Sequence, residues 1–293
     1  PVLVDISKDA QMPEIEWEYD DSPVQIPGYR PDLNTLPADL QAAAELIQSA
    51  RRPVILAGHG ILISGAMPEV LEFAERTQTP VACTLLGIGA FPGSHPLSLG
   101  MPGMHGEAWV NQTIQEADLV LAFGMRFDDR VTGNLKQFAP KARKIHIDID
   151  PSEINKIKGA DFAAVSDLKY ALSELNKVVK APADLAPWAE RINGWKKADP
   201  FKYRDDAESI LPQHAIRELW KLTKDRETII ATGVGQHQMW SAQFYLFDKP
   251  RTWLSSAGLG TMGFGLPAAV GAKVAHPDKL VVDIDGDGSL LMN

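Results

Sequence analysis

Short apolar runs alternate with helical segments through most of this sequence, and that alternation constrains the fold more than any other feature. The runs are rich in valine, isoleucine and leucine, and they span residues 53–57, 80–83, 118–123, 144–149, 228–232, 252–254 and 280–284. Such runs are typical of buried parallel strands. Helical spacing or composition marks the intervening segments at 40–47, 69–76, 107–116, 151–154, 212–222, 236–240 and 266–275. Because parallel strands need crossover connections, the sequence predicts an α/β fold, with a doubly wound parallel sheet in a central domain and part of a second parallel α/β domain after it.

Proline-rich stretches predict the domain boundaries. Residues 9–36 and 179–211 contain several prolines and few apolar runs, which is typical of linkers. We therefore expect the central domain at 37–178 and the second domain, truncated, at 212–293. Residues 1–6 have the pattern of a strand with no partner before it. We accordingly expect 1–8 to be the end of an earlier domain, and the chain to be a piece of a longer polypeptide.

Composition narrows the function classes. The formal net charge of −9 argues against general binding to nucleic acid or anionic membranes, because phosphate groups would be repelled. The single cysteine, Cys83, excludes an internal disulfide and is typical of a reducing compartment. Neither a secretory signal nor a transmembrane run is apparent. These features predict a cytoplasmic protein without nucleic-acid or membrane partners.

The strands of the predicted central domain end in residues suited to the phosphates and sugars of a nucleotide cofactor. These residues are Gly58, Thr84, Leu85, Asp148, Ile149 and the segment 124–130. Glycine after a strand admits a phosphate close to the backbone, and a carboxylate at a strand end can accept from ribose hydroxyls. The dinucleotide fingerprint itself is incomplete, because Ile63 stands where its third glycine is expected.

Three glycine-rich turns follow the strands of the second domain, at 233–237, 258–265 and 285–289. The carboxyl ends of parallel strands share one edge of a sheet, so the three turns are expected to line one crevice. Asp287 in the last turn suits Mg²⁺, a hard cation that takes few protein oxygens and completes its shell with waters and phosphate. The alternative for this segment is an ordinary acidic turn.

The longer motifs resemble the large catalytic subunit of acetohydroxyacid synthase (acetolactate synthase), a transferase of branched-chain amino acid biosynthesis that depends on thiamin diphosphate. They are Gly-Val-Gly-Gln-His-Gln-Met-Trp at 233–240, Gly-Leu-Gly-Thr-Met-Gly-Phe-Gly at 258–265 and Asp-Gly-Asp-Gly-Ser at 285–289, together with Gly-Met-His-Gly at 103–106, Arg-Phe-Asp-Asp-Arg-Val-Thr-Gly at 126–133 and His-Ile-Asp-Ile-Asp at 146–150. The resemblance implies that 1–8 ends a pyrimidine-binding domain, 37–178 is an FAD-binding domain and 212–293 opens a diphosphate-binding domain.

The resemblance also implies site residues, carried over position by position. Thiamin diphosphate contacts are implied at Gln236, His237, Gly260, Thr261, Met262, Asp287, Gly288 and Ser289, with Asp287 as the Mg²⁺ ligand. FAD contacts are implied at Thr84, Leu85, Gly103, Met104, His105, Gly124, Arg126, Asp128, Asp148 and Asp167, and the strand-end residues Gly58 and Ile149 complete the cofactor-binding set. Lys8 and Arg130 match the mouth of the substrate channel. A plainer alternative is that Arg126 and Arg130 pair with Asp128 and Asp129.

The implied reaction decarboxylates pyruvate and joins the two-carbon unit to a second 2-ketoacid. The resemblance implies a homodimer or tetramer, with a regulatory subunit as a further partner and FAD in a structural role. It also implies that the catalytic glutamate and a second metal-ligating asparagine lie outside these residues, so the piece alone is expected to be inactive. Two alternatives stay open. One is another thiamin diphosphate enzyme, such as a pyruvate oxidase, glyoxylate carboligase or 2-ketoacid decarboxylase. The other is a non-catalytic nucleotide-binding module.

Overall fold

The computed structural model of the chain describes residues 6–14, 16, 18, 40–180, 184–198, 203 and 209–293. The chain divides into two compact units, Pro1–Asp32 and Leu33–Asn293. In the first unit the only described regular element is a short 3-10 helix, η1 (Asp9–Gln11). The strand predicted at 1–6 and most of the linker predicted at 9–36 fall outside the described residues.

The larger sheet of the second unit has six parallel strands and confirms the predicted doubly wound fold. The strands are β1 (Pro53–Ala57), β2 (Val81–Cys83), β3 (Ser98–Gly100), β4 (Leu119–Phe123), β5 (Arg143–Asp148) and β6 (Phe162–Val165), in the spatial order β3-β2-β1-β4-β5-β6. Every residue of β1 and β4 is buried, which explains why both strands are apolar throughout.

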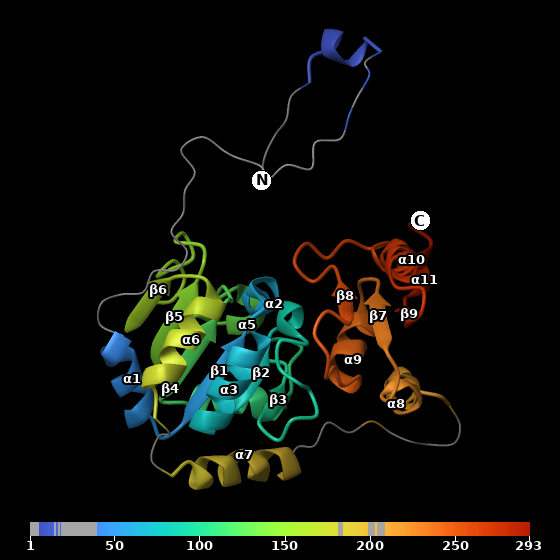
Figure 1. Ribbon diagram of the computed structural model, residues 1–293. Coiled ribbons are helices and arrows are strands. Elements are labelled where there is room, and N and C mark those ends of the chain that lie inside the picture. The colour runs from blue at the N-terminus through green and yellow to red at the C-terminus, as the bar shows by residue number, and fades with distance from the viewer. Residues whose placement is uncertain are drawn as a thin grey trace. The chain divides into compact units, whose positions relative to one another are not determined.

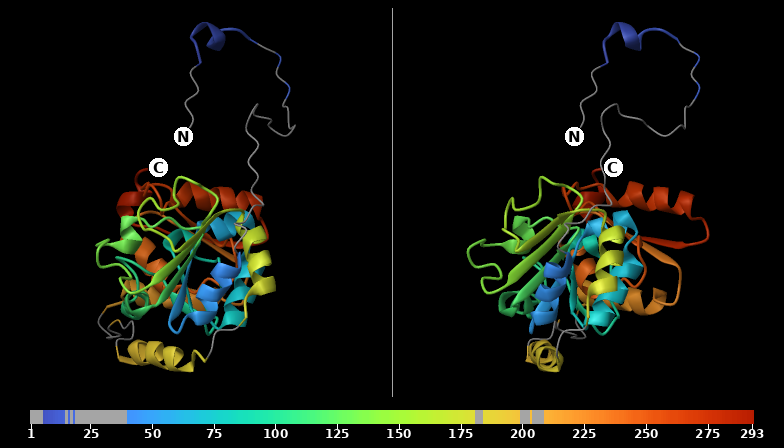
Figure 2. Two further views of the ribbon diagram at one scale, coloured as in Figure 1. Left: turned by 90° about the vertical axis from the view of Figure 1, so that its left-hand side faces the viewer. Right: turned by 60° about the vertical axis from the view of Figure 1, so that its left-hand side comes forward.

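Helices cover both faces of this sheet because alternate strand residues point to opposite sides. Ile55 and Ala57 share a core with the helices α1 (Leu40–Ser49), α2 (His59–Ser64), α3 (Met67–Thr77) and α6 (Leu168–Val178). Val54 and Leu56 share a second core with α4 (Ala108–Glu116) and α7 (Ala186–Ala198). Figures 1 and 2 show α1, α3 and α6 together on one side of the sheet.

The helix α7 lies within the stretch predicted to be a linker, and it packs on the sheet. Its Trp188 is buried and donates its indole N–H to the backbone oxygen of Pro53 at 3.0 Å. The stretch between the two sheets therefore contributes to the core of the first one.

The strand order reverses between β1 and β4, which creates the kind of switch point where open parallel sheets bind ligands. Gly58 follows β1 and Gly124 follows β4, and the backbone N–H of Gly58 donates to the oxygen of Phe123 at 2.9 Å. A Cβ on Gly58 would lie 2.1 Å from the oxygen of Gly124. The close approach of the two turns therefore requires glycine at position 58.

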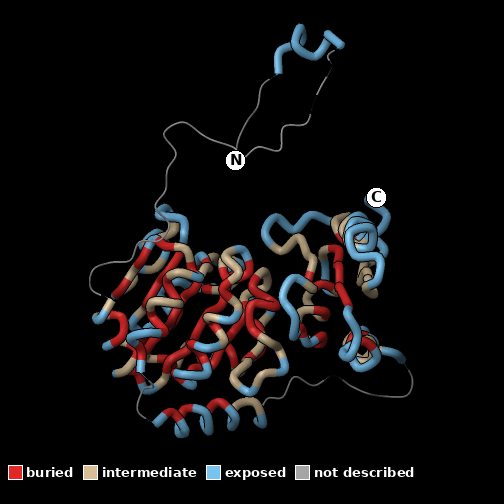
Figure 3. The backbone as a smooth tube through the Cα atoms, viewed as in Figure 1, coloured by how far each residue is buried: buried red, intermediate tan, exposed pale blue. Residues whose placement is uncertain are grey.

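The second sheet is smaller and also parallel, in the order β8-β7-β9. Its strands are β7 (Thr228–Thr232), β8 (Trp253–Ser255) and β9 (Leu280–Ile284), and its helices are α8 (Pro212–Thr223), α9 (Gln236–Phe244), α10 (Gly265–Ala275) and α11 (Asp287–Leu290). Its core includes Ile216, Ile230, Phe244 and Trp253. Figure 3 shows α10 mostly exposed, in contrast to the buried strands of the larger sheet.

One predicted helix is wrong. Residues 151–156 form turns instead of the helix expected from Pro151. The carboxylate of Asp150 accepts from the backbone N–H of Ser152 at 2.8 Å, and Asn155 has a φ of +58°. Side chains that bond to nearby backbone groups favour turns over helix propagation. No helix in the described part of the chain has the length and apolar character needed to cross a membrane.

Candidate functional site

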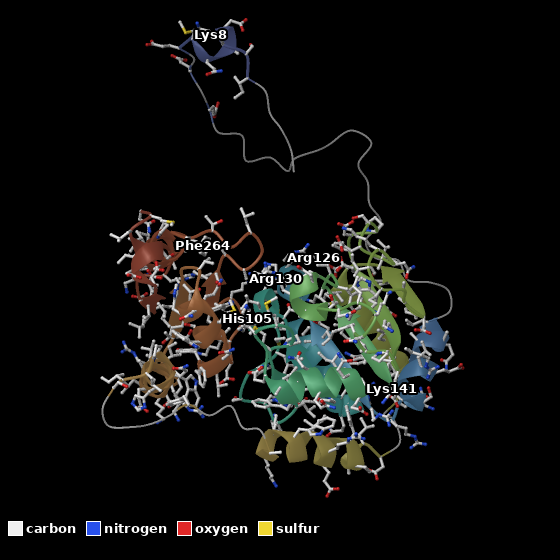
Figure 4. The ribbon with its side chains drawn as sticks, turned by 180° about the vertical axis from the view of Figure 1, so that it is seen from behind. Lys8, His105, Arg126, Arg130, Lys141 and Phe264 are labelled. Carbon is white, nitrogen blue, oxygen red and sulfur yellow. The ribbon has the colours of Figure 1, made fainter. Side chains whose placement is uncertain are left out.

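A cleft of about 880 Å³ lies between the carboxyl ends of the two sheets within the second unit. The larger sheet contributes the residues that follow β1, β2 and β4, and the smaller sheet contributes those that follow β7 and β8. The predicted site residues that line it are Thr84, Leu85, His105, Gly124, Arg126, Asp128, Arg130, Gln236 and Gly260. Figure 4 shows His105, Arg126 and Arg130 near one another where the two halves of the unit meet.

The segment after β4 carries two arginines and the cap of a short helix, α5 (Asp129–Thr132). Asp128 accepts from the backbone N–H groups of Arg130 and Val131 at 2.9 and 3.2 Å, so this carboxylate fixes the start of α5. Arg126 lies 3.6 Å from Asp128, and Arg130 lies 3.9 Å from Asp129. Both arginine side chains are largely exposed, so these pairs contribute little to stability and leave the guanidinium groups accessible to a ligand.

A second wall of the cleft comes from residues 101–107, which we call the 101–107 loop. Gly103 has a φ of +97° and is held on both sides by Asn111, which accepts from its N–H at 2.8 Å and donates to its oxygen at 2.9 Å. The backbone N–H of Met104 donates to the oxygen of Arg130 at 2.9 Å. The loop is therefore fixed to α4 and to the segment after β4.

Glu107 ends this loop and was not singled out from the sequence. Its carboxyl group is buried and accepts from the backbone N–H of Met101 at 2.7 Å. Burial raises the pKa of Glu107 to about 7, against the backbone hydrogen bonds and the charge of Lys196, which lower it. A glutamate at the start of a predicted helix was the available signal, but the sequence alone could not show that its carboxyl group turns inward.

The three glycine-rich turns of the smaller sheet meet around Ser289, but only the first two line the cleft, whose lining includes no residue of 285–289. Ser289 is buried, and its hydroxyl oxygen accepts from the backbone N–H groups of Gly263 at 3.0 Å and Val234 at 3.4 Å. A Cβ on Gly233 would lie 1.8 Å from a carboxylate oxygen of Asp285 and 2.3 Å from the Ser289 hydroxyl. One buried serine thus ties together the turns after β7, β8 and β9.

His237 lies between two of these turns. A Cβ on Gly235 or on Gly286 would come within about 3 Å of its imidazole ring. Its Nε2 atom is 3.4 Å from Asp285, but the angle leaves that nitrogen without a hydrogen bond. Burial lowers the pKa of His237, while Asp285 and the backbone of Gly233 oppose that effect. The imidazole ring therefore fills the space beside both Gly235 and Gly286.

Two carboxylates on β9 and in its following turn were given no role from the sequence, although Asp285 belongs to the turn singled out at 285–289. Asp283 and Asp285 are two residues apart on one side of the strand, and each has a buried oxygen without a hydrogen-bond partner. Burial, with the charge of Asp285, raises the pKa of Asp283 to about 6. Two acids with strand periodicity inside an apolar run were the signal for them.

Asp287, the predicted metal ligand, is exposed at the first position of α11. Thr261 and Gly288 are exposed as well, and the methyl carbon of Met262 lies 3.6 Å from where a Cβ on Gly288 would be. Among the described residues no group of three or more His, Cys, Asp or Glu side chains could hold a metal ion by itself.

Several predicted residues lie elsewhere. Gly58, Asp148, Ile149 and Asp167 do not line the cleft in the described structure. Asp148 accepts from the N–H of Asp150 at 2.9 Å, and burial raises its pKa, whereas Asp167 caps α6 through the N–H of Tyr170 at 3.1 Å. Lys8 belongs to the first unit, just before η1. The roles predicted for these residues remain predictions.

Comparison with known proteins decides the family. Residues 40–175 match the model for the thiamine pyrophosphate enzyme central domain, and residues 233–293 match the model for the C-terminal TPP binding domain of the same enzymes. The chain belongs to the thiamine pyrophosphate enzymes. The two matches fall on the two α/β halves of the second unit, one on the larger sheet and one on the smaller.

Within the thiamine pyrophosphate enzymes, this chain is similar to plant acetolactate synthases over its full length. It is 50% identical over 302 residues to acetolactate synthase 2, chloroplastic, of Zea mays and 50% identical over 300 residues to acetolactate synthase 1, chloroplastic, of Oryza sativa subsp. japonica. The identity to acetolactate synthase, chloroplastic, of Arabidopsis thaliana is 48% over 302 residues. Each alignment covers 100% of this chain and 44–46% of the relative, so the chain spans about half the length of the curated relatives it matches.

These relatives overturn the prediction of a cytoplasmic protein, because their names place them in the chloroplast. A single cysteine indicates only that a protein does not depend on disulfides. It does not distinguish one reducing compartment from another, and this is why the prediction was wrong.

Proposed function

We propose that the full-length protein containing this chain is an acetolactate synthase, a transferase of branched-chain amino acid biosynthesis. It releases CO₂ from pyruvate and joins the remaining two-carbon unit to the ketone carbon of a second 2-ketoacid. The observation that carries the proposal is the meeting of three glycine-rich turns around Ser289, in a chain about half identical to acetolactate synthases.

The residues of this meeting point fit a diphosphate held by Mg²⁺. A Cβ on Gly233, Gly263 or Gly286 would lie within about 3.2 Å of Asp285, Met292 or His237, so the three turns need glycine to approach one another, and Asp287 presents an exposed carboxylate beside them. Mg²⁺ is typically bound by one or two carboxylates together with substrate phosphates, so one aspartate in this chain is compatible with the metal. Thiamin diphosphate, when bound, supplies the electron sink for decarboxylation, and the protein supplies position and proton control.

The chain's own residues have distinct tasks in this proposal. Asp287 would hold the metal ion, and Gln236, His237, Gly260, Thr261, Gly288 and Ser289 would contact the diphosphate. Met262 would pack its flexible apolar side chain against the cofactor. Arg130 is proposed to attract the carboxylate of a 2-ketoacid substrate, and the same role is proposed separately for Lys8 of the first unit. The catalytic glutamate and a second metal-ligating asparagine are expected in other parts of the full-length protein.

FAD is proposed as a second cofactor, with a structural role. The volume of the cleft is within the range of cofactor sites. Gly124, which has no side chain, lines the cleft at the switch point between β1 and β4. Arg126 offers a largely exposed guanidinium to a phosphate, and Thr84 and Asp128 stand beside it in the lining. The other proposed contacts are Gly58, Leu85, Gly103, Met104, His105, Asp148, Ile149 and Asp167.

The proposed assembly is a homodimer or tetramer, with a regulatory subunit as a further partner. Val270 and Val274 on the helix α10 are 57% and 79% exposed. Exposed apolar surface of this kind is a candidate contact for another part of the full-length chain or for a partner subunit. Sedimentation of the full-length protein measures the assembly, and a monomer at micromolar concentration would contradict it.

A product assay tests the proposed function. The full-length protein is incubated with pyruvate, Mg²⁺, thiamin diphosphate and FAD, and the products are identified by mass. Acetolactate and CO₂ are expected. Peroxide or acetaldehyde from pyruvate, or tartronate semialdehyde in a parallel incubation with glyoxylate, would indicate another thiamin diphosphate enzyme. Adenine-nucleotide binding without thiamin diphosphate binding would indicate a nucleotide-binding module.

A further inference from the structure

One side chain of the smaller half of the second unit contacts the 101–107 loop of the larger half. Gln243, in the last turn of α9, donates from its side-chain amide to the backbone oxygen of His105 at 2.6 Å. Gln243 is half-buried and lines the cleft next to His105. The bond therefore crosses from one wall of the cleft to the other.

The two ends of this connection lie at different parts of the cleft. Gln236 opens α9 at the turn after β7, and Gln243 stands seven residues later, or roughly 10 Å along the helix axis. Because Gln243 and Gln236 belong to one helix, a ligand that fixes the 101–107 loop also restrains, through Gln243, the turn that carries Gln236 and His237.

The loop end of the connection is well anchored. Asn111 holds Gly103 by two hydrogen bonds, and Glu107 holds the N–H of Met101 at 2.7 Å. His105 stands between these anchors, so its carbonyl group has little freedom. A glutamine that binds such a fixed carbonyl is itself held in one position.

We propose that Gln243 is a positioning residue that couples the two cofactor sites, so that FAD bound on the 101–107 loop strengthens Mg²⁺-dependent thiamin diphosphate binding at the turn after β7. This inference rests on the proposed function, because it requires both cofactors. By linkage, thiamin diphosphate strengthens FAD binding by the same factor.

Other hydrogen bonds join the two halves, and they set the expected size of the effect. The indole N–H of Trp253 donates to the oxygen of Leu85 at 3.1 Å, and the N–H of Gly93 donates to the oxygen of Phe247 at 2.9 Å. These bonds persist when Gln243 is changed, so the halves stay together. Loss of one hydrogen bond lowers the coupling by a factor of roughly 2 to 10.

The experiment is a thermodynamic cycle on the full-length protein. The dissociation constant of thiamin diphosphate, in the presence of Mg²⁺, is measured by calorimetry without FAD and with saturating FAD. The dissociation constant of FAD is measured in the same way, without and with thiamin diphosphate. Wild type and Gln243→Met are compared, because methionine keeps the length and removes the donor. Gln243→Glu is a second variant of the same shape, and Gln41→Met, on the exposed face of α1, is the matched control.

In wild type, FAD is expected to tighten thiamin diphosphate binding several-fold, and the control variant should show the same factor. In both Gln243 variants the factor by which FAD tightens thiamin diphosphate binding should fall toward one, a decrease of roughly 2- to 10-fold. Each cofactor should still bind to these variants by itself. Equal coupling in wild type and the Gln243 variants, or no coupling in wild type, overturns the inference and leaves the proposed function intact. Failure of the wild type to bind thiamin diphosphate overturns both.

Discussion

Replacing Glu107 with glutamine should make the protein more stable at alkaline pH and leave it unchanged at acid pH. Glutamine has the shape of glutamate, and its amide oxygen can still accept from the backbone N–H of Met101, which the carboxyl group holds at 2.7 Å. The substitution therefore removes the charge and keeps the hydrogen bond.

The size of the effect follows from the pKa of Glu107, which burial raises from 4.5 to about 7. A difference of this size corresponds to about 3 kcal/mol of folding free energy. Below about pH 4.5 the carboxyl group is neutral in both the folded and the unfolded state, so its burial does not change the free energy of unfolding with pH. As the pH rises, the unfolded chain ionises first, so the folded state loses stability until about pH 7 and the loss is then complete. Glu107→Gln should therefore gain under 1 kcal/mol at about pH 5 and about 3 kcal/mol at about pH 8.

Urea unfolding of wild type and Glu107→Gln at the two pH values, followed by tryptophan fluorescence, measures this difference. The surface variant Glu45→Gln, on α1, is measured beside them to remove the general effect of replacing a glutamate. A free-energy difference between Glu107→Gln and wild type that is the same at both pH values would refute the reasoning, because the buried carboxyl group would then carry no raised pKa.

Three further predictions follow from the surroundings of Gly233, Cys83 and Asp128. Gly233→Ala should weaken thiamin diphosphate binding by roughly tenfold or more, because the added Cβ would lie 1.8 Å from Asp285. The control variant Gly271→Ala, whose Cβ would meet nothing within 4 Å, should bind thiamin diphosphate normally. Calorimetry compares the two variants. Cys83 is buried with its pKa raised to about 12, so a thiol reagent at about pH 8 should label it only after unfolding, and rapid labelling of the folded protein would contradict this. Asp128→Ala should lower the unfolding free energy by about 1 kcal/mol through loss of the α5 cap, whereas Asp128→Asn should restore most of it in the same urea titration.

The sequence predicted the strands whose residues are buried on both faces, because such strands are continuous apolar runs. β1, β4 and β7 are of this kind, with all five residues of each buried. β3 and β6 were missed, since they are short edge strands that include exposed or small residues. Edge position alone does not hide a strand, because β9 is also an edge strand and its five-residue run was predicted.

The candidate site was predicted where a glycine turn follows a strand, because the topology alone brings such turns to one edge. The convergence around Ser289 is of this type. Glu107 and Gln243 could not be predicted, since their significance depends on partners that only the folded chain brings near: Met101 for one and His105 for the other. Gln243 and His105 are 138 residues apart in the chain, whereas Glu107 turns toward Met101, six residues before it, only because of how the 101–107 loop folds.

The central claim is that the three glycine-rich turns hold a diphosphate through Mg²⁺ at Asp287. Calorimetric titration of the full-length protein with thiamin diphosphate, with Mg²⁺ or with a chelator, tests it most directly. We predict binding that requires the metal and is lost in Asp287→Ala. Equal binding in the chelator, or unchanged binding by Asp287→Ala, would contradict the account.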